Sequence, residues 1–186
     1  MTGISFVVGK RTIIEQSKTY PKRSYYCNLY MQYHYFEAHG EMHFTPPVQT
    51  VYAMRQAIKE YFAEGEQKKW ERHTRVFEAL HKGIERLGFQ NIIKRDWQAG
   101  LVVTVKYPDD PNWSFSAIHD YCYKRGFTIY PGKINNTETF RLCALGAIDQ
   151  SDIETFFEVF EAGLREMEVS LPVHYGLEEQ TEIGRA

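Results

Sequence analysis

One arginine in an apolar strand is the residue with the clearest potential chemistry. Arg141 lies between Phe140 and Leu142 in the segment GFTIYPGKINNTETFRLCALG, residues 126–146. An unpaired charge in such surroundings costs several kcal/mol, so we expect the guanidinium to bind an anion. Its planar fork holds a carboxylate or a phosphonate through two parallel hydrogen bonds, which lysine cannot do. The alternative is an arginine at the edge of the core that is paired with Glu138 or Asp149.

A threonine before two prolines is the second candidate. Thr45 follows Phe44 and precedes Pro46 and Pro47, which suit the first turn of a helix. A hydroxyl together with the free N–H groups of a helix N-terminus favours binding of a phosphate. The alternative is an ordinary N-cap threonine.

Two lysines and three histidines are weaker candidates for chemistry. A lysine that forms an imine needs a dry pocket, and we expect Lys10 and Lys133 to be solvated surface residues, although Lys133 can line the mouth of a site. The histidines His34, His39 and His43 lie in one segment but lack the spacing of a known metal motif. We therefore expect no metal site.

Composition narrows the class of partner. The 186-residue chain has 43% hydrophobic residues, which suffices for a core. Its formal net charge of -2 provides no positive field that would attract nucleic acid or an anionic membrane. Its three cysteines have no CxxC spacing, which is typical of reduced thiols and a cytoplasmic protein. The apolar run 4–8 is too short for a signal sequence or a membrane span.

The N-terminal elements are predicted with unequal clarity. Residues 4–8 are predicted to form a largely buried strand, and 12–17 a short helix. The tyrosine-rich stretch 18–41 has little periodicity, so we expect irregular structure there. Apolar residues at helical spacing predict one helix from Pro46 to Phe62 and a second over 66–87, with a domain boundary between them.

The rest of the chain predicts a small α/β sandwich. Strands are expected at 89–93 and 101–107, a helix at 114–125, strands at 127–130 and 139–145, and a last helix capped by Asp149 or Ser151 and ending at Glu168. The order β-β-α-β-β-α predicts a mostly antiparallel sheet with helices on one face. Residues after 168 are expected to form a flexible tail.

Several of these segments resemble, in the same order, the C-terminal part of the 2-aminoethylphosphonate–pyruvate transaminases. These enzymes are class V aminotransferases of pyridoxal-phosphate fold type I. The resemblance covers residues 3 to about 168 and is carried by 3–10 (GISFVVGK), 41–51 (EMHFTPPVQTV), 107–111, 127–133, 140–146 and 149–168.

The resemblance implies a transaminase that moves an amino group from 2-aminoethylphosphonate to pyruvate through pyridoxal 5'-phosphate. Arg141 would hold the carboxylate or phosphonate of the substrate, and Thr45 would contact the cofactor phosphate of the neighbouring subunit of a homodimer. Residues 1–65 would be the tail of the large cofactor-binding domain, 66–168 the small domain and 169–186 a flexible tail. Met42 and Cys143 depart from the family pattern, in which an aromatic residue and a glycine are usual.

The Schiff-base lysine of the family precedes the strand that corresponds to residues 4–8, so this chain lacks it and is expected to be inactive alone. Two alternatives remain open. One is another class V aminotransferase, such as an alanine–glyoxylate enzyme. The other is a non-catalytic α/β module for binding or interaction.

Overall fold

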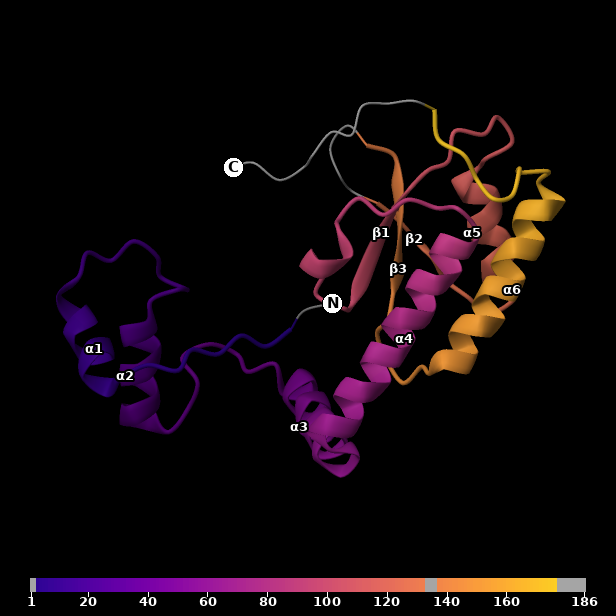
Figure 1. Cartoon of the computed structure of the whole chain (residues 1–186). Coiled ribbons are helices and arrows are strands. Elements are labelled where there is room, and N and C mark those ends of the chain that lie inside the picture. Colours follow the sequence, from indigo (N-terminus) through magenta and orange to yellow (C-terminus); the bar gives the residue numbers. More distant parts are fainter. Residues whose placement is uncertain (1–2, 133–136, 177–186) are drawn as a thin grey trace. The chain divides into compact units, whose positions relative to one another are not determined.

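The computed structural model describes residues 3–132 and 137–176 (Figure 1). The chain divides into two compact units, residues 1–64 and 65–186, which we call unit 1 and unit 2.

Unit 1 consists of helices joined by turns and loops. Its elements are α1 (Arg11–Gln16), the 3-10 turn η1 (Ser17–Thr19), α2 (Leu29–His39) and α3 (Val48–Glu64). Helices α1 and α2 are joined by the hydroxyl of Tyr33, which donates to Glu15 at 3.2 Å, and by an ion pair between Arg11 and Glu37 at 3.7 Å. Both contacts are exposed, so polar surface interactions hold this pair of helices together.

None of the described side chains of unit 1 is buried. The predicted buried strand at 4–8 is wrong, because these residues form no strand and Phe6 and Val8 are 72% and 89% exposed. A strand buries its apolar side chains only when neighbouring strands flank it. The described part of unit 1 contains no other strand that could do so.

The prediction of irregular structure over 18–41 is also wrong, because α2 lies within it. The Asn28 side chain caps this helix by accepting a hydrogen bond from the Met31 N–H at 3.0 Å. Gly40 ends it in the left-handed conformation at φ 66°, which glycine adopts without steric cost. The helix has tyrosines and histidines on all sides, so its sequence has no apolar stripe to indicate it.

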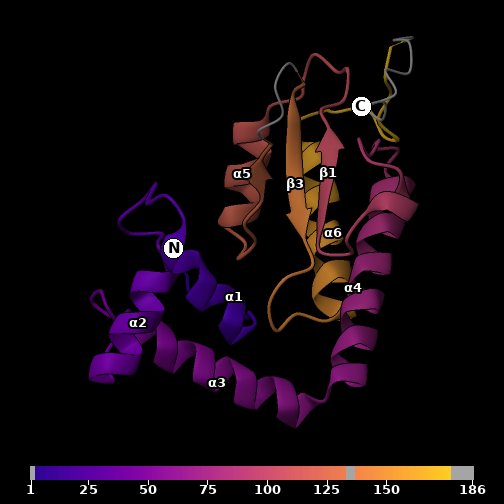
Figure 2. The same ribbon diagram turned by 90° about the vertical axis from the view of Figure 1, so that its left-hand side faces the viewer.

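Unit 2 packs three helices against a three-stranded antiparallel sheet in the strand order β1-β3-β2. Its elements are α4 (Glu66–Arg86), η2 (Arg95–Trp97), β1 (Val102–Lys106), α5 (Phe115–Tyr123), β2 (Tyr130–Pro131), β3 (Thr139–Cys143) and α6 (Gln150–Glu166). Figure 1 shows α4, α5 and α6 on one side of this sheet, and Figure 2 shows the same unit after a 90° turn. The predicted α/β class is confirmed.

The core of unit 2 lies between the sheet and the helices. Alternate residues of β1 and β3 point into it, among them Val103, Val105, Phe140 and Leu142, each at most 4% exposed. Phe140 packs against the rings of Trp113 and Phe160 at centroid distances of 5.7 and 5.9 Å, on the helical side of the sheet. The other face of the sheet carries the intervening residues.

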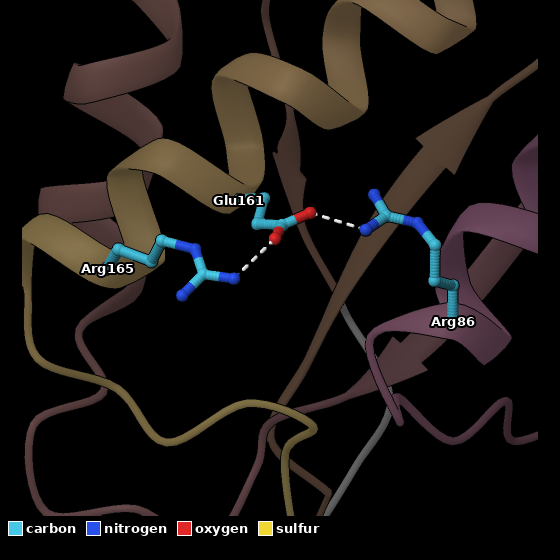
Figure 3. A network of polar contacts seen from close by, with 3 residues as sticks. All are labelled: Arg86, Glu161 and Arg165. Atoms are coloured by element: carbon cyan, nitrogen blue, oxygen red, sulfur yellow. Dashed lines mark hydrogen bonds and ion pairs between the residues drawn. The ribbon is translucent and has the colours of Figure 1, made fainter.

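Helices α4 and α6 lie side by side and meet at a glycine. Gly83 of α4 leaves room for the ring of Phe157, which a Cβ at this position would approach to 2.1 Å. Beyond this contact, Glu161 of α6 forms ion pairs with Arg86 of α4 and with Arg165 at 2.7 Å (Figure 3). These two ion pairs hold the pKa of the Glu161 carboxyl below its usual value, and Arg86 makes the larger contribution.

The sequence locates the last helix accurately. Asp149 is the N-cap of α6, where its carboxylate accepts the Asp152 N–H at 3.3 Å and the Ser151 N–H at 2.8 Å, while the Asp152 carboxylate accepts the Asp149 N–H at 2.9 Å. This reciprocal capping box confirms Asp149 rather than Ser151 as the cap.

Three predictions for unit 2 differ from the structure. Of the strand expected at 127–130 only Tyr130 is in a strand, the two-residue β2. The segment 89–93 forms only an isolated bridge between Asn91 and Val105, so the first of the four predicted strands is absent from the described residues. Residues 169–176, expected to be part of a flexible tail, instead lie against the core, with Val169 and Val173 about 5% exposed. The Val173 N–H donates to the Leu87 carbonyl at 2.8 Å. Residues 177–186 lie outside the described part.

Candidate functional site

Arg141 occupies the middle of β3, the central strand of the sheet. Its neighbours Phe140 and Leu142 are buried in the core at 1% and 4% exposure, whereas Arg141 is half-buried. Because successive side chains of a strand point to opposite faces, Arg141 projects from the face of the sheet that lies away from the helices. The charge is therefore outside the apolar core.

The guanidinium is fixed through one nitrogen. Nε of Arg141 donates a hydrogen bond to the carbonyl of Pro131 in β2 at 3.2 Å. Among the described residues, no carboxylate forms an ion pair with Arg141; Asp149 is engaged in capping α6, and Glu138 is exposed. The two terminal nitrogens are thus left available to an anion.

Arg141 forms a row with residues of both neighbouring strands. It is paired with Thr104 of β1 on one side and with Tyr130 of β2 on the other. Residues directly opposite each other in antiparallel strands share a face, with Cβ atoms about 4.5–5.5 Å apart. The row places a cation between two hydroxyl groups on one open surface.

Cys143 lies two residues further along β3 and therefore on the same face as Arg141. Partial burial raises the pKa of its thiol, and the positive charge of Arg141 opposes that effect. The burial effect is the larger, so the thiol stays protonated at neutral pH.

The described residues also form a groove between α4 and α6, lined by Thr74, Arg75, Glu78, Ala79, Lys82, Gly83, Arg86, Gln150, Ile153, Glu154, Phe157 and Glu158. Arg141 does not contribute to this groove. The residue lies instead on the open sheet face of unit 2, where a closed site would need a second surface over it.

Thr45 lies in unit 1, three residues before the start of α3, and is exposed. The N–H groups of Val48 and Val51 donate to the carbonyls of Pro46 and Pro47 at 2.9 and 3.0 Å. Within the described residues, the N–H groups of Gln49 and Thr50 have no backbone acceptor, as expected in the first turn of a helix. Free N–H groups at a helix N-terminus favour a phosphate, and the Thr45 hydroxyl precedes them in the chain.

An aromatic cluster precedes this helix. The ring of His43 packs against Tyr35 and Phe44 at centroid distances of 4.8 and 4.5 Å, and both of its nitrogens are buried without a partner among the described residues. His43 lies two residues before Thr45, and the sequence indicates it only as one of three histidines in the same segment. The aromatic rings around it were the signal, but their contacts depend on the fold of α2.

Thr45 belongs to unit 1 and Arg141 to unit 2. Lys10 is exposed beside α1, and Lys133 lies outside the described residues. No group of three or more histidine, cysteine or acidic side chains in the described ranges is arranged to hold a metal ion. None of the described helices has the length and apolar character that a membrane crossing requires.

Comparison with known proteins identifies relatives over most of the chain. The chain is 35% identical over 170 residues to the 2-aminoethylphosphonate–pyruvate transaminase 1 of Cupriavidus pinatubonensis, which covers 91% of the chain and 45% of that protein. It is 36% identical over 152 residues to the corresponding transaminase 2 of Paraburkholderia xenovorans, covering 81% of the chain and 41% of that protein. The chain thus spans less than half the length of these relatives. No protein-family model matches it.

Solved structures show the same fold. The pyridoxamine–pyruvate aminotransferase of Mesorhizobium loti superposes with a TM-score of 0.72 at 15% identity, over 87% of this chain and 42% of that one. The ureidoglycine–glyoxylate aminotransferase of Bacillus subtilis gives 0.68 at 18% identity, over 84% and 41%. The chain is therefore a homologue of the 2-aminoethylphosphonate–pyruvate transaminases and has the α/β fold of the matching part of the aminotransferases.

Proposed function

We propose that this chain provides the substrate-anion contact and a cofactor-phosphate contact of a pyridoxal-phosphate-dependent transaminase, which moves an amino group from 2-aminoethylphosphonate to pyruvate. The names of the relatives support this choice of substrates. The observation that carries the proposal is the guanidinium of Arg141, held through Nε alone with its terminal nitrogens free of any described acid.

Arg141 binds the acidic group of each substrate in turn. Nε is occupied by the Pro131 carbonyl, so the carboxylate of pyruvate or the phosphonate of the amino donor is held end-on by the two terminal nitrogens. Each substrate is thereby oriented through the group that does not react, which is how an enzyme positions its reacting atoms.

Thr45 binds the phosphate of pyridoxal phosphate with its hydroxyl and the N–H groups of Gln49 and Thr50. The cofactor, when bound, supplies the electron sink for amino-group transfer. Positive partial charge at the N-terminus of α3 adds to the attraction for the phosphate.

We further propose a homodimer in which Thr45 serves the site of the neighbouring subunit. Unit 1 exposes apolar side chains that a second subunit would cover, since contiguous apolar surface on a protein marks an interaction site. They include Val48, Val51, Tyr52, Ile58 and Phe62 of α3. A cytoplasmic location is supported by the three free cysteines, Cys27, Cys122 and Cys143.

The experiment supplies the part of the protein that this chain does not span. The chain is co-expressed with the portion of the Cupriavidus pinatubonensis transaminase outside the aligned 170 residues, and alanine formation from 2-aminoethylphosphonate and pyruvate is measured with added pyridoxal phosphate. We expect activity from the pair and none from either piece alone. A well-folded complex that binds the cofactor yet forms no alanine contradicts the proposal.

Two substitutions test the assigned residues. Arg141→Gln removes two charge-assisted hydrogen bonds and is expected to lower kcat/KM about 100-fold for both substrates, whereas Arg75→Gln on the exposed face of α4 leaves it unchanged. Thr45→Ala is expected to raise the cofactor concentration needed for half-maximal activity about tenfold, and Thr155→Ala serves as the control on α6. Equal losses in variant and control would remove the assignment.

An alanine–glyoxylate aminotransferase remains the second candidate within this class. The solved structure of such an enzyme from Nostoc sp. shares the fold at a TM-score of 0.67 and 20% identity. The relatives above 30% identity favour the phosphonate substrate. The same assay with glyoxylate and alanine separates the two candidates.

A further inference from the structure

The row across the sheet places a second hydrogen-bond donor beside the anion site. Tyr130 of β2 is the direct partner of Arg141, so the two side chains project from the same face. The Tyr130 side chain is 53% exposed. In the described part of the chain its hydroxyl has no hydrogen-bond partner.

The Arg141 side chain leans over β2 and not over β1. The Gly132 N–H donates to the Thr139 carbonyl, so it points toward β3. In a trans peptide the Pro131 carbonyl points the opposite way, away from β3. Nε of Arg141 reaches that carbonyl, which means that the guanidinium extends across β2, past Tyr130. The guanidinium therefore extends away from Thr104, which lies on the other side of Arg141.

A phosphonate and a carboxylate present different numbers of oxygens to this arrangement. A guanidinium whose Nε is occupied can hold two oxygens end-on with its terminal nitrogens. Both oxygens of a carboxylate are then bound to the guanidinium. A phosphonate has a third oxygen, which carries part of the negative charge and needs another donor.

We propose that Tyr130 is a specificity-determining residue that donates its hydroxyl hydrogen to the third oxygen of a phosphonate held by Arg141. The proposal rests on the function proposed for Arg141 and names the group that distinguishes the two substrates. The carboxylate of pyruvate uses the guanidinium alone, whereas the phosphonate of the amino donor uses both residues. Tyr130 therefore stabilises one of the two substrates that share the site.

The test measures binding of two probes that differ only in the acidic group. Ethylphosphonate and propionate are titrated separately into the isotope-labelled 186-residue chain, and the dissociation constants are taken from the shifts of backbone amides in β3. The same titrations are run on Tyr130→Phe, which removes one oxygen, and on Arg141→Gln. Tyr123→Phe on α5 is the matched control, since Tyr123 is also exposed, at 64%.

We expect Tyr130→Phe to weaken ethylphosphonate binding about five- to tenfold, the usual effect of losing one hydrogen bond at a solvent-exposed site, and to change propionate binding less than twofold. Tyr123→Phe changes neither. If Tyr130→Phe weakens both probes equally or neither, the proposal for Tyr130 is overturned, while loss of both probes in Arg141→Gln leaves the role of Arg141 intact. If the unchanged chain binds neither probe, the role of Arg141 and the proposal for Tyr130 both fail.

Discussion

Replacement of Gly83 by alanine tests the close packing of α4 on α6. Alanine is the better helix former, by up to about 1 kcal/mol, so the substitution would stabilise an exposed helix. At this position, however, the new Cβ would lie 2.1–2.4 Å from three carbons of the Phe157 ring. Favourable carbon–carbon contact requires about 3.5–4 Å, so the ring must move.

On the side of the core the ring has little room to move. Phe157 is 5% exposed and packs against Phe156 and Phe160 at centroid distances of 5.1 and 6.4 Å. Overpacking of a filled core costs about 1–3 kcal/mol, which exceeds the gain in helix propensity. We expect Gly83→Ala to lower the free energy of unfolding of unit 2 by about 1–2 kcal/mol.

Unfolding by urea, followed by tryptophan fluorescence, measures this change. All three tryptophans, Trp70, Trp97 and Trp113, lie in unit 2, so the signal does not include unit 1. Lys82→Ala is the control, because Lys82 is exposed on the same helix. Gly83→Ala should lower the free energy of unfolding less in a Phe157→Leu background than in the unchanged chain, because the ring that the new Cβ approaches is gone. A stabilised Gly83→Ala would refute the packing of these two helices.

Two further predictions concern charge and thiol chemistry. Glu161→Gln is expected to lower the free energy of unfolding by about 1 kcal/mol at pH 7, since it removes partly exposed ion pairs with Arg86 and Arg165. The pKa of the Glu161 carboxyl is lowered in the folded protein, so the stabilisation is complete above the ordinary carboxyl pKa of 4.5 and disappears as the pH falls through the lowered value. The free energies of unfolding of the variant and the unchanged chain, measured by urea titration, should therefore converge in acid. A difference that stays constant with pH would contradict the ion pairs. Burial raises the pKa of the Cys122 thiol to about 11, whereas Cys27 is exposed. Iodoacetamide at pH 8 should therefore alkylate Cys27 in the native chain and Cys122 only after denaturation. Peptide mass spectrometry measures the alkylation of each cysteine. Equal rates at the two thiols in the native chain would show that the core around α5 opens readily.

Local sequence patterns predicted the elements that carry their own signals. Helices α4 and α6 have apolar residues at helical spacing, and Asp149, a residue type favoured at the N-cap, indicates the start of α6. The strand around Arg141 is likewise visible as an apolar run interrupted by one charge. Since Phe140 and Leu142 must point inward, the alternation of a strand alone places Arg141 on the opposite face.

The predictions that failed depended on partners distant in the chain. The apolar run 4–8 reads as a strand, but strand pairing is supplied by other segments, and the described part of unit 1 has none to offer. The sequence does not predict helix α2 for a different reason. Its caps at Asn28 and Gly40 are local signals, yet its aromatic residues show no single apolar face that would indicate a helix.

The amino-acid sequence by itself determined the α/β class, the two long helices of unit 2 and the candidacy of Arg141, because each follows from residues within a few positions of one another. Only the tertiary structure decided that the guanidinium is tied to the Pro131 carbonyl, that Tyr130 stands beside it and that residues 169–176 close over the core. Those contacts join segments whose register is set by packing and strand pairing across the whole unit, and no local pattern encodes that register.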